Sequence, residues 1–288
     1  VINGKVYIGS EDRNIYCLDA DTGSLIWSYT TGSEVSSSPA VINGKVYIGS
    51  YDHNIYCLDA DTGQLIWKYT TGACVSSSPA IAYGKVYIGS QDHNIYCLDA
   101  DTGDLIWKYT TGDNIVSSPA IVNGKVYIGS TDHTLYCLDA DNGDFIWKYT
   151  TDGPVWSSPA VAYGKVYVGS YDHNIYCLDA DTGQLIWSHD TGEAVTSSPA
   201  IADGKVYVGS HNKYLYCLDA DTGEEFWAFL VGKVFLSSPA IANGKLYIGS
   251  GDHRIYCIED YPNNHSPLTP TTPSGPQNVI AGLPYTYT

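Results

Sequence analysis

An internal repeat of constant length constrains the fold of this chain more than any other feature. The run Gly-Lys-Val-Tyr-Ile-Gly-Ser begins at residue 4 and returns, with conservative changes, at residues 44, 84, 124, 164, 204 and 244. Each copy is followed by Tyr-Cys-Leu-Asp-Ala or, in the last copy, Tyr-Cys-Ile-Glu-Asp. In six copies a Trp and then Ser-Ser-Pro-Ala come next. A fixed period of this size is typical of architectures built from stacked units.

Each repeat is expected to form four short strands. In the second repeat these are residues 37–42, 44–50, 54–60 and 65–71, which are rich in Val, Ile, Tyr, Thr and Trp. Asn43-Gly44 between the first two strands suits a type I′ hairpin, and Asp-Ala-Asp-Thr-Gly joins the last two. No stretch shows helical periodicity. Four strands per repeat predict an all-β fold, a seven-bladed β-propeller.

Proline indicates which strand is innermost. Pro39 and its equivalents interrupt the first strand of each complete repeat. Because proline cannot donate to a ladder, that strand must be an edge. In a propeller the edge that lines the central channel is crowded, and the small Ser and Ala residues around Pro39 fit it.

The ends of the repeat suggest a domain plan. The second and third strands occur seven times, and the first and fourth only six times. We therefore expect a propeller over residues 1–260 with incomplete first and last blades, excised from a longer chain whose upstream segment supplies the missing strands. Residues 261–278 are expected to be a Pro/Ser/Thr-rich linker, and residues 279–288 the start of a truncated β-sandwich-like domain.

Charge excludes one class of partner. Lys and Arg total 14 against 31 Asp and Glu, which gives a formal net charge of −17. Such a surface repels phosphate, so no nucleic acid is expected. No apolar run is long enough to span a bilayer in this piece of sequence.

The cysteines are expected to be structural. Seven of the eight occupy one strand position, at Cys17 and once in every later repeat up to Cys257. Equivalent positions in neighbouring blades lie beyond the roughly 7 Å that a disulfide can bridge, so buried, unpaired thiols are predicted. Cys74 lies in a loop and is the one candidate for a reactive or pairing thiol.

The segment GKVYVGSYDHNIYCLDADTGQLIW at 164–187 resembles the pyrroloquinoline-quinone-type propeller repeat. That family includes quinone-dependent dehydrogenases, outer-membrane assembly lipoproteins and surface proteins of archaea and bacteria. The resemblance implies a non-enzymatic cell-surface or extracellular protein, with Gly23 and its equivalents in a turn. It also implies a structural Trp packed between blades, at Trp27, Trp67, Trp107, Trp147, Trp187 and Trp227. The end of the chain, NVIAGLPYTYT, resembles the first strand of a polycystic-kidney-disease-type or other immunoglobulin-like domain.

The apparatus of the dehydrogenases is not visible. They use adjacent cysteines, and this chain has no Cys-Cys pair. Every loop keeps its length from repeat to repeat, whereas an active site usually breaks such symmetry. We therefore expect no catalytic residue, no bound metal and no cofactor.

Two repeated motifs have functional alternatives. Asp59, Asp61 and Gly63 echo the start of a calcium loop, but a strand follows where further ligands are needed, which favours a plain turn. A basic residue recurs in another turn, mostly as His (His53 in the second repeat). It could form a pH-dependent ring of charge, but a surface turn that tolerates His is the favoured explanation.

The loops that vary between repeats define a candidate binding face, which carries Tyr51, Trp156, Tyr171, Phe235 and Leu236. Relaxed drift in loops is the competing explanation. On the opposite face Tyr83 and Tyr163 replace the hairpin Asn and are expected to be exposed.

Three functions compete. The favoured one is a non-catalytic scaffold for protein or surface contacts; the others are a lectin-like propeller that binds a cell-surface glycan or small ligand, and a quinone-dependent dehydrogenase.

Overall fold

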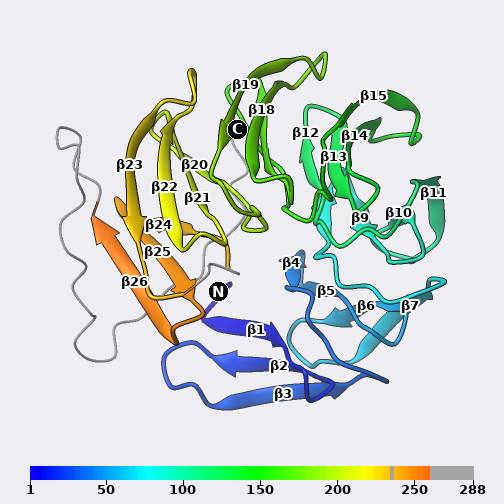
Figure 1. Ribbon diagram of the computed structural model, residues 1–288. Coiled ribbons are helices and arrows are strands. Elements are labelled where there is room, and N and C mark those ends of the chain that lie inside the picture. The colour runs from blue at the N-terminus through cyan, green and yellow to red at the C-terminus, as the bar shows by residue number, and fades with distance from the viewer. Residues whose placement is uncertain (234–236, 260–288) are drawn as a thin grey trace. The chain divides into compact units, whose positions relative to one another are not determined.

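The computed structural model describes residues 1–233 and 237–259. It contains 26 β-strands in seven antiparallel sheets, and no helix occurs in these residues. The chain is a seven-bladed all-β propeller, as the repeat predicts (Figure 1). The expected linker and second domain lie outside the described residues, as do Phe235 and Leu236.

The strands fall into four classes, which we call inner, second, third and outer in chain order. The inner strands are β4 (Ala40–Ile42), β8 (Ala80–Ala82), β12 (Ala120–Val122), β16 (Ala160–Ala162), β20 (Ala200–Ala202) and β24 (Ala240–Ala242). The second strands are β1 (Lys5–Gly9), β5 (Lys45–Gly49), β9 (Lys85–Gly89), β13 (Lys125–Ser130), β17 (Lys165–Gly169), β21 (Lys205–Gly209) and β25 (Lys245–Ser250). The third strands are β2 (Asn14–Asp19), β6 (Asn54–Asp59), β10 (Asn94–Asp99), β14 (Thr134–Asp139), β18 (Asn174–Asp179), β22 (Tyr214–Asp219) and β26 (Arg254–Glu259). The outer strands are β3 (Leu25–Thr30), β7 (Leu65–Thr70), β11 (Leu105–Thr110), β15 (Phe145–Thr150), β19 (Leu185–Asp190) and β23 (Glu225–Leu230).

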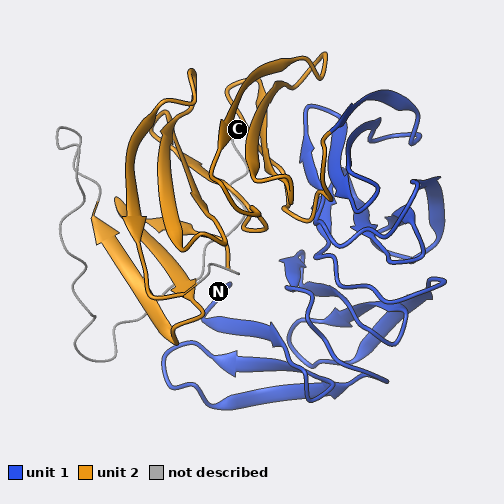
Figure 2. Cartoon of the chain, viewed as in Figure 1, with its two compact units in different colours: residues 1–150 blue, residues 151–288 orange. Residues whose placement is uncertain are grey.

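The chain divides into two compact units, Val1–Thr150 and Thr151–Thr288 (Figure 2). The first holds the three-stranded sheet β1–β3 and the four-stranded sheets β4–β7, β8–β11 and β12–β15. The second holds β16–β19, β20–β23 and the three-stranded sheet β24–β26. Within the described residues the first and last sheets have three strands each.

The first strand of each repeat is shorter than predicted. It begins at Ala40 and not at Ser37, so Pro39 lies just before the strand. Side chains replace the ladder in the Ser-Ser-Pro segment: the Ser37 Oγ accepts the Gly49 N–H at 3.1 Å, and the Ser38 N–H donates to the Ser78 Oγ at 2.8 Å. The strand is nevertheless a sheet edge, as proline requires.

The hairpin between inner and second strands has the predicted geometry. Asn43 and Gly44 have φ of 51° and 73°, which is the pair of positive values that a type I′ turn needs. Tyr83 and Tyr163 adopt the same conformation, with φ of 53°, and are exposed.

The core lies between adjacent sheets of one unit. Ile15, Cys17 and Trp27 of the first blade pack against Val46 and Leu58 of the second. The Lys45 ammonium is 2.5 Å from the Asp101 carboxylate of the next blade. In these contacts the core of one blade is completed by the next blade of the same unit.

Candidate functional site

Two variable positions of the repeat lie side by side in a blade. One is in the connection that leads to the inner strand, and the other is in the turn between the second and third strands. The Gln91 Nε2 donates to the Ser76 Oγ at 3.2 Å, and the Thr196 Oγ1 lies 2.9 Å from the His211 Nε2. The rings of Trp156 and Tyr171 meet edge to face at 4.6 Å.

Backbone hydrogen bonds hold the connection against the turn. The Tyr171 N–H donates to the Pro154 carbonyl at 3.0 Å, and the His211 N–H donates to the Ala194 carbonyl at 2.9 Å. Because these bonds recur with each repeat, the scaffold stays constant while the two side chains change. Such rigid presentation of variable loop residues is common at binding sites.

In the second unit these side chains join into one feature. The Tyr171 ring also meets the His211 ring of the next blade, at 6.1 Å and 73°. We call Trp156, Tyr171 and His211 the aromatic strip. Trp156 is 44% exposed, whereas Tyr171 and His211 are half-buried. Burial raises the pKa of Tyr171, so its hydroxyl stays protonated at neutral pH.

Of the other predicted binding residues, Phe235 and Leu236 lie outside the described residues. Tyr51 lies in the first unit, where its carbonyl accepts the Cys74 thiol at 3.4 Å. Sequence reasoning did not include His211 or Thr196 among the candidate binding residues. The two variable positions keep the same spacing in every repeat, and that regularity was the signal that they form a pair.

The tryptophans of the outer strands lie at the contacts between blades. The indole N–H donates to an alanine carbonyl 33 residues later, at 3.0 to 3.2 Å, for Trp27, Trp67, Trp107 and Trp187. Trp147 and Trp227 are buried as well.

The repeated basic residue is explained by backbone geometry. His53 has a φ of 73°, and the six equivalent residues lie between 69° and 78°. Asn, Asp and His enter this left-handed region more readily than other side chains. The charge ring remains a prediction.

Side chains that could carry chemistry are engaged in structural bonds. The Asp59 Oδ1 accepts the N–H groups of Asp61 and Thr62 and the Thr62 hydroxyl, at 2.8 to 3.0 Å. The Tyr47 hydroxyl donates to the Ala100 carbonyl at 3.0 Å. Burial raises the pKa of the Cys57 thiol to about 12, which removes the reactive thiolate at neutral pH.

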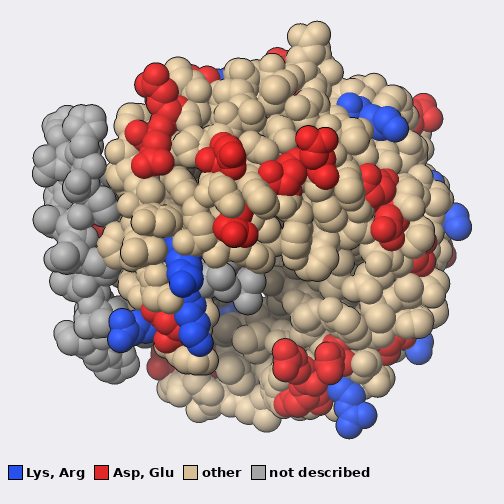
Figure 3. All heavy atoms as spheres, viewed as in Figure 1, with Lys and Arg blue, Asp and Glu red and all other residues tan. Residues whose placement is uncertain are grey.

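Charge is spread unevenly over one face of the molecule. On the face that Figure 3 shows, Asp and Glu are scattered over several sheets, and a group of Lys and Arg side chains lies over β25 and β26. No helix of the described residues could cross a membrane.

Two family models of β-propellers match the sequence. The family model described as the β-propeller of the β-alanine-activating enzyme matches residues 2–163, more than half of the sequence. The chain belongs to this family of propellers. A second model, described as outer membrane protein assembly factor BamB, matches residues 171–261. The expected pyrroloquinoline-quinone-like repeat is therefore confirmed. No curated protein matches the sequence.

Solved structures share the family's fold. BamB from Moraxella catarrhalis is similar with a TM-score of 0.80 and 19% identity, over 94% of this chain and 84% of that one. The computationally designed Ika8 protein is similar with a TM-score of 0.83 and 20% identity, over 94% and 85%. Since 1670 solved chains match, the fold alone does not select a function.

Proposed function

We propose that this chain is a non-catalytic scaffold that binds a protein partner in the cell envelope or at the cell surface. The aromatic strip carries the proposal, because it presents a partly exposed Trp156 that Tyr171 and His211 support from the side. Aromatic anchors of this kind supply much of the energy of protein interfaces. The BamB family, whose model matches residues 171–261, is described as an assembly factor of the outer membrane, which supports an envelope location.

The non-catalytic part of the proposal rests on how reactive side chains are used. Buried thiols with raised pKa, phenols bonded to carbonyls and carboxylates bonded within their own turns recur from blade to blade. A general base or a nucleophile needs the opposite: a free side chain with a pKa near neutrality.

Site-specific photocrosslinking tests the partner directly. We would place a benzophenone amino acid at position 156 in cells that express the native protein, with position 76, the equivalent residue of a blade that has no aromatic pair, as the matched control. We expect one discrete protein adduct from position 156 and none from position 76. Equal adducts from both positions would show that the aromatic strip is not the binding site.

Two further assays separate the alternatives. Binding to a panel of cell-surface glycans, lost on Trp156→Ser, would favour the lectin-like function. Dye-linked oxidation of alcohols with Ca²⁺ and pyrroloquinoline quinone, abolished by a chelator, would favour the dehydrogenase. We expect neither result.

A further inference from the structure

Two hairpins of the propeller carry a residue that their turn does not favour. The first position of the hairpin that leads into the second strand is Tyr in two repeats and Asn or Asp in the others: Asn3, Asn43, Asn123, Asp203 and Asn243. Tyr83 and Tyr163 both have a φ of 53°, which is unusual for a bulky side chain. Because strained residues cluster at functional sites, the two tyrosines mark candidate sites.

The Tyr83 side chain is exposed but held in place. Tyr83 is 62% exposed and Tyr163 is 60% exposed, the highest fractions among the large apolar side chains of the described residues. The Tyr83 hydroxyl accepts the Gly124 N–H at 3.3 Å. Gly124 belongs to the hairpin between β12 and β13, so the phenol crosses the space between the hairpins of two adjacent blades, which we call the seam. The aromatic ring is thereby presented to solvent in a fixed orientation.

A carboxylate lies close to this ring. The Tyr83 hydroxyl is bound to Gly124, which also accepts the Ala140 N–H at 2.8 Å. Asp141 follows directly in the chain. The Lys85 ammonium is 2.7 Å from the Asp141 carboxylate, and the Asp141 side chain is 83% exposed. The lysine therefore holds the carboxylate from one side and leaves the other side open to a ligand.

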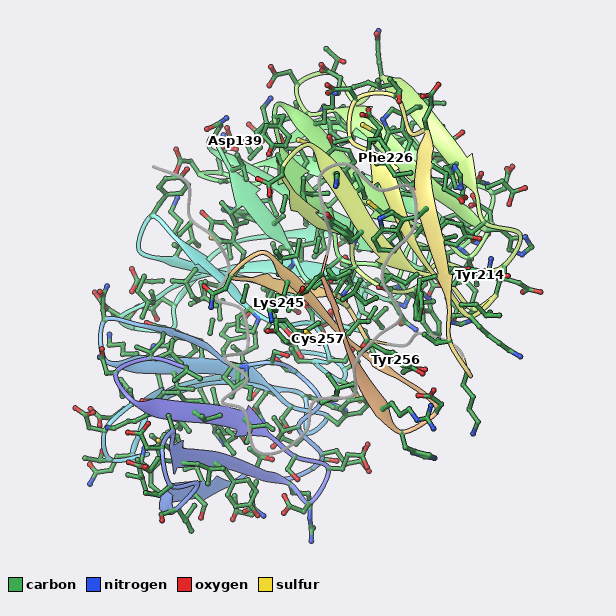
Figure 4. All side chains as sticks on the ribbon, turned by 90° about the vertical axis from the view of Figure 1, so that its left-hand side faces the viewer. Asp139, Tyr214, Phe226, Lys245, Tyr256 and Cys257 are labelled. Carbon is green, nitrogen blue, oxygen red and sulfur yellow. The ribbon has the colours of Figure 1, made fainter. Side chains whose placement is uncertain are left out.

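The turn that carries Asp141 is fixed by hydrogen bonds of its own. Asp139, which Figure 4 labels at the end of β14, accepts the Asp141 N–H at 2.8 Å and the Asn142 N–H at 3.1 Å through its Oδ1. The ring and the carboxylate are thus positioned before a ligand arrives, which lowers the entropy cost of binding.

The seam itself is concave where its hairpin residue is small. Between the first two blades, where Asn3 takes the place of Tyr83, the seam is a hollow of about 250 Å³ with Lys5 and Asp61 in its lining. Lys5 and Asp61 form the same ion pair, at 2.6 Å. Tyr83 therefore adds an aromatic ring to a place that is hollowed and polar in the first pair of blades.

The second unit repeats the arrangement at Tyr163. Lys165 forms an ion pair with Asp221 of the next blade, whose side chain is also mostly exposed. The Asp219 Oδ1 accepts the Asp221 N–H at 2.8 Å. We call Tyr83 with its lysine and aspartate the first platform, and Tyr163 with Lys165 and Asp221 the second platform.

The polar surroundings of each platform indicate the class of ligand. Protein interfaces are depleted of charged residues at their centre, whereas here an ion pair lies beside the aromatic ring. A sugar has the matching amphipathic character. The C–H groups on one face of a pyranose lie against the negative face of an aromatic ring, and its hydroxyls donate to a carboxylate. The exposed aspartates and the formal net charge of −17 repel anionic sugars.

We propose that each platform binds a neutral pyranose, stacked on the tyrosine ring with a hydroxyl that donates to the aspartate. A pyranose whose hydroxyls are all equatorial, such as β-linked glucose, fits best, because the two faces of its ring carry only C–H groups. The hairpin of each platform lies at the opposite end of its second strand from the turn that holds Tyr171 in the fifth blade. The platforms are therefore separate from the aromatic strip.

Saturation-transfer NMR of the full chain with cellotetraose, a neutral tetramer of β-linked glucose, tests the proposal. Tyr83→Asn and Tyr163→Asn should each remove about half of the signal, and the double variant should raise the Kd at least about tenfold. Asn43 shows that the hairpin accepts asparagine, so the melting temperature should not fall. Tetragalacturonate, an anionic tetramer, should not bind.

Matched carboxylates provide the control. In the Tyr163→Asn background, Asp141→Asn should weaken the remaining site. Asp61→Asn should not, although Asp61 forms the same ion pair with Lys5 in a seam without a tyrosine. Adding Asn43→Tyr to the double tyrosine variant should restore binding, because Asn43 precedes a lysine that is paired in the same way, Lys45 with Asp101.

Several outcomes would overturn the proposal. They are a wild-type chain that does not bind cellotetraose, a double variant that binds it as tightly as the wild type, and equal losses from Asp141→Asn and Asp61→Asn. Failure of Asn43→Tyr to restore binding at an unchanged melting temperature would also count against it. Tetragalacturonate that binds as tightly as cellotetraose would overturn the assignment to neutral sugars.

Discussion

Trp27 donates its indole N–H to the carbonyl of Ala60 in the next blade, at 3.0 Å. The same indole lies against Gly63, where an added Cβ would come within 2.7 Å of the ring. One tryptophan therefore fixes both a hydrogen bond and a close approach of the following turn.

Gly63→Ala should destabilise the protein more than Gly44→Ala. Both glycines have φ near +70°, so each substitution carries a left-handed strain of roughly 1–2 kcal/mol. Only Gly63 faces Trp27, and overpacking there adds about 1–3 kcal/mol. Urea unfolding followed by Trp fluorescence measures the free energy of unfolding of each variant. Equal decreases for the two variants would show that the Trp27 ring moves aside without destabilising the protein.

Asn212→Asp should destabilise the sixth blade. In other blades an Asp accepts the N–H of the preceding loop, as Asp92 does from Gly72 at 2.6 Å. Here the Asn212 amide donates to the Thr191 carbonyl, while the Gly192 N–H turns to Asp190 at 2.7 Å. A carboxylate would face a carbonyl oxygen, which costs about 1–3 kcal/mol.

The partner substitution Asp190→Thr should rescue that variant. The double variant has the Thr and the Asp that the second blade and its neighbour have at these positions. The peptide between Thr191 and Gly192 can then turn so that the Gly192 N–H donates to the new carboxylate, as the Gly72 N–H donates to Asp92. Thermal unfolding of the single and double variants is the measurement. A double variant no more stable than Asn212→Asp would contradict this account.

Acid should weaken the fold through Asp52 and Asp92. Burial alone would raise the pKa of Asp52, but hydrogen bonds from the Tyr56 hydroxyl and the Gly32 N–H outweigh it, and the pKa is lowered. Asp92 behaves alike. A lowered folded pKa stabilises the protein above the unfolded pKa of about 3.9. That stability is lost as pH falls from there through the folded pKa.

Tyr56→Phe separates this effect from general acid sensitivity. It removes a donor to Asp52, so the melting temperature should depend less on pH between about 5 and 2. Tyr47→Phe is the control, because that hydroxyl donates to the uncharged Ala100 carbonyl at 3.0 Å. Identical pH profiles for the two variants would count against the role of Asp52.

The thiols should fall into two groups. Six of the seven strand cysteines are buried, but Cys257 is half-buried, contrary to the prediction for all seven. Among the residues that the structure describes, β26 is the last strand of its three-stranded sheet, and Ile255 in that strand is 57% exposed. Iodoacetamide should modify Cys74 and Cys257 in the native protein, and all eight cysteines in denaturant without reductant. In mass spectrometry a disulfide would appear as two cysteines that iodoacetamide did not modify.

The sequence predicts the strands and turns well because the same pattern of residues recurs in every repeat, so that each strand is predicted several times. The hairpin at Asn43-Gly44 and the edge position of Ala40–Ile42 both follow from residue chemistry. The early start assigned to the inner strand was wrong, because Ser37 and Ser38 use side chains where a ladder would use backbone. The exposed Tyr83 and Tyr163 were predicted from the hairpin pattern.

The candidate site was predicted only in part. Variation between repeats identified Trp156 and Tyr171, and the structure joins them to His211. Which variable side chains touch depends on how the connection folds over the turn, and spacing along one chain does not reveal that.

The hydrogen bond from each outer-strand Trp to an alanine 33 residues later bears on how the protein is made. The Tyr47 hydroxyl reaches further still, to a carbonyl 53 residues ahead. While the ribosome is still extending the chain, a blade whose own strands have emerged lacks the acceptors for both. Chains fold from the N-terminus as they are synthesised, so each nascent blade stays unfinished for about one more repeat. A pause in translation would expose the newest Trp, and a chaperone that recognises aromatic side chains would find it there.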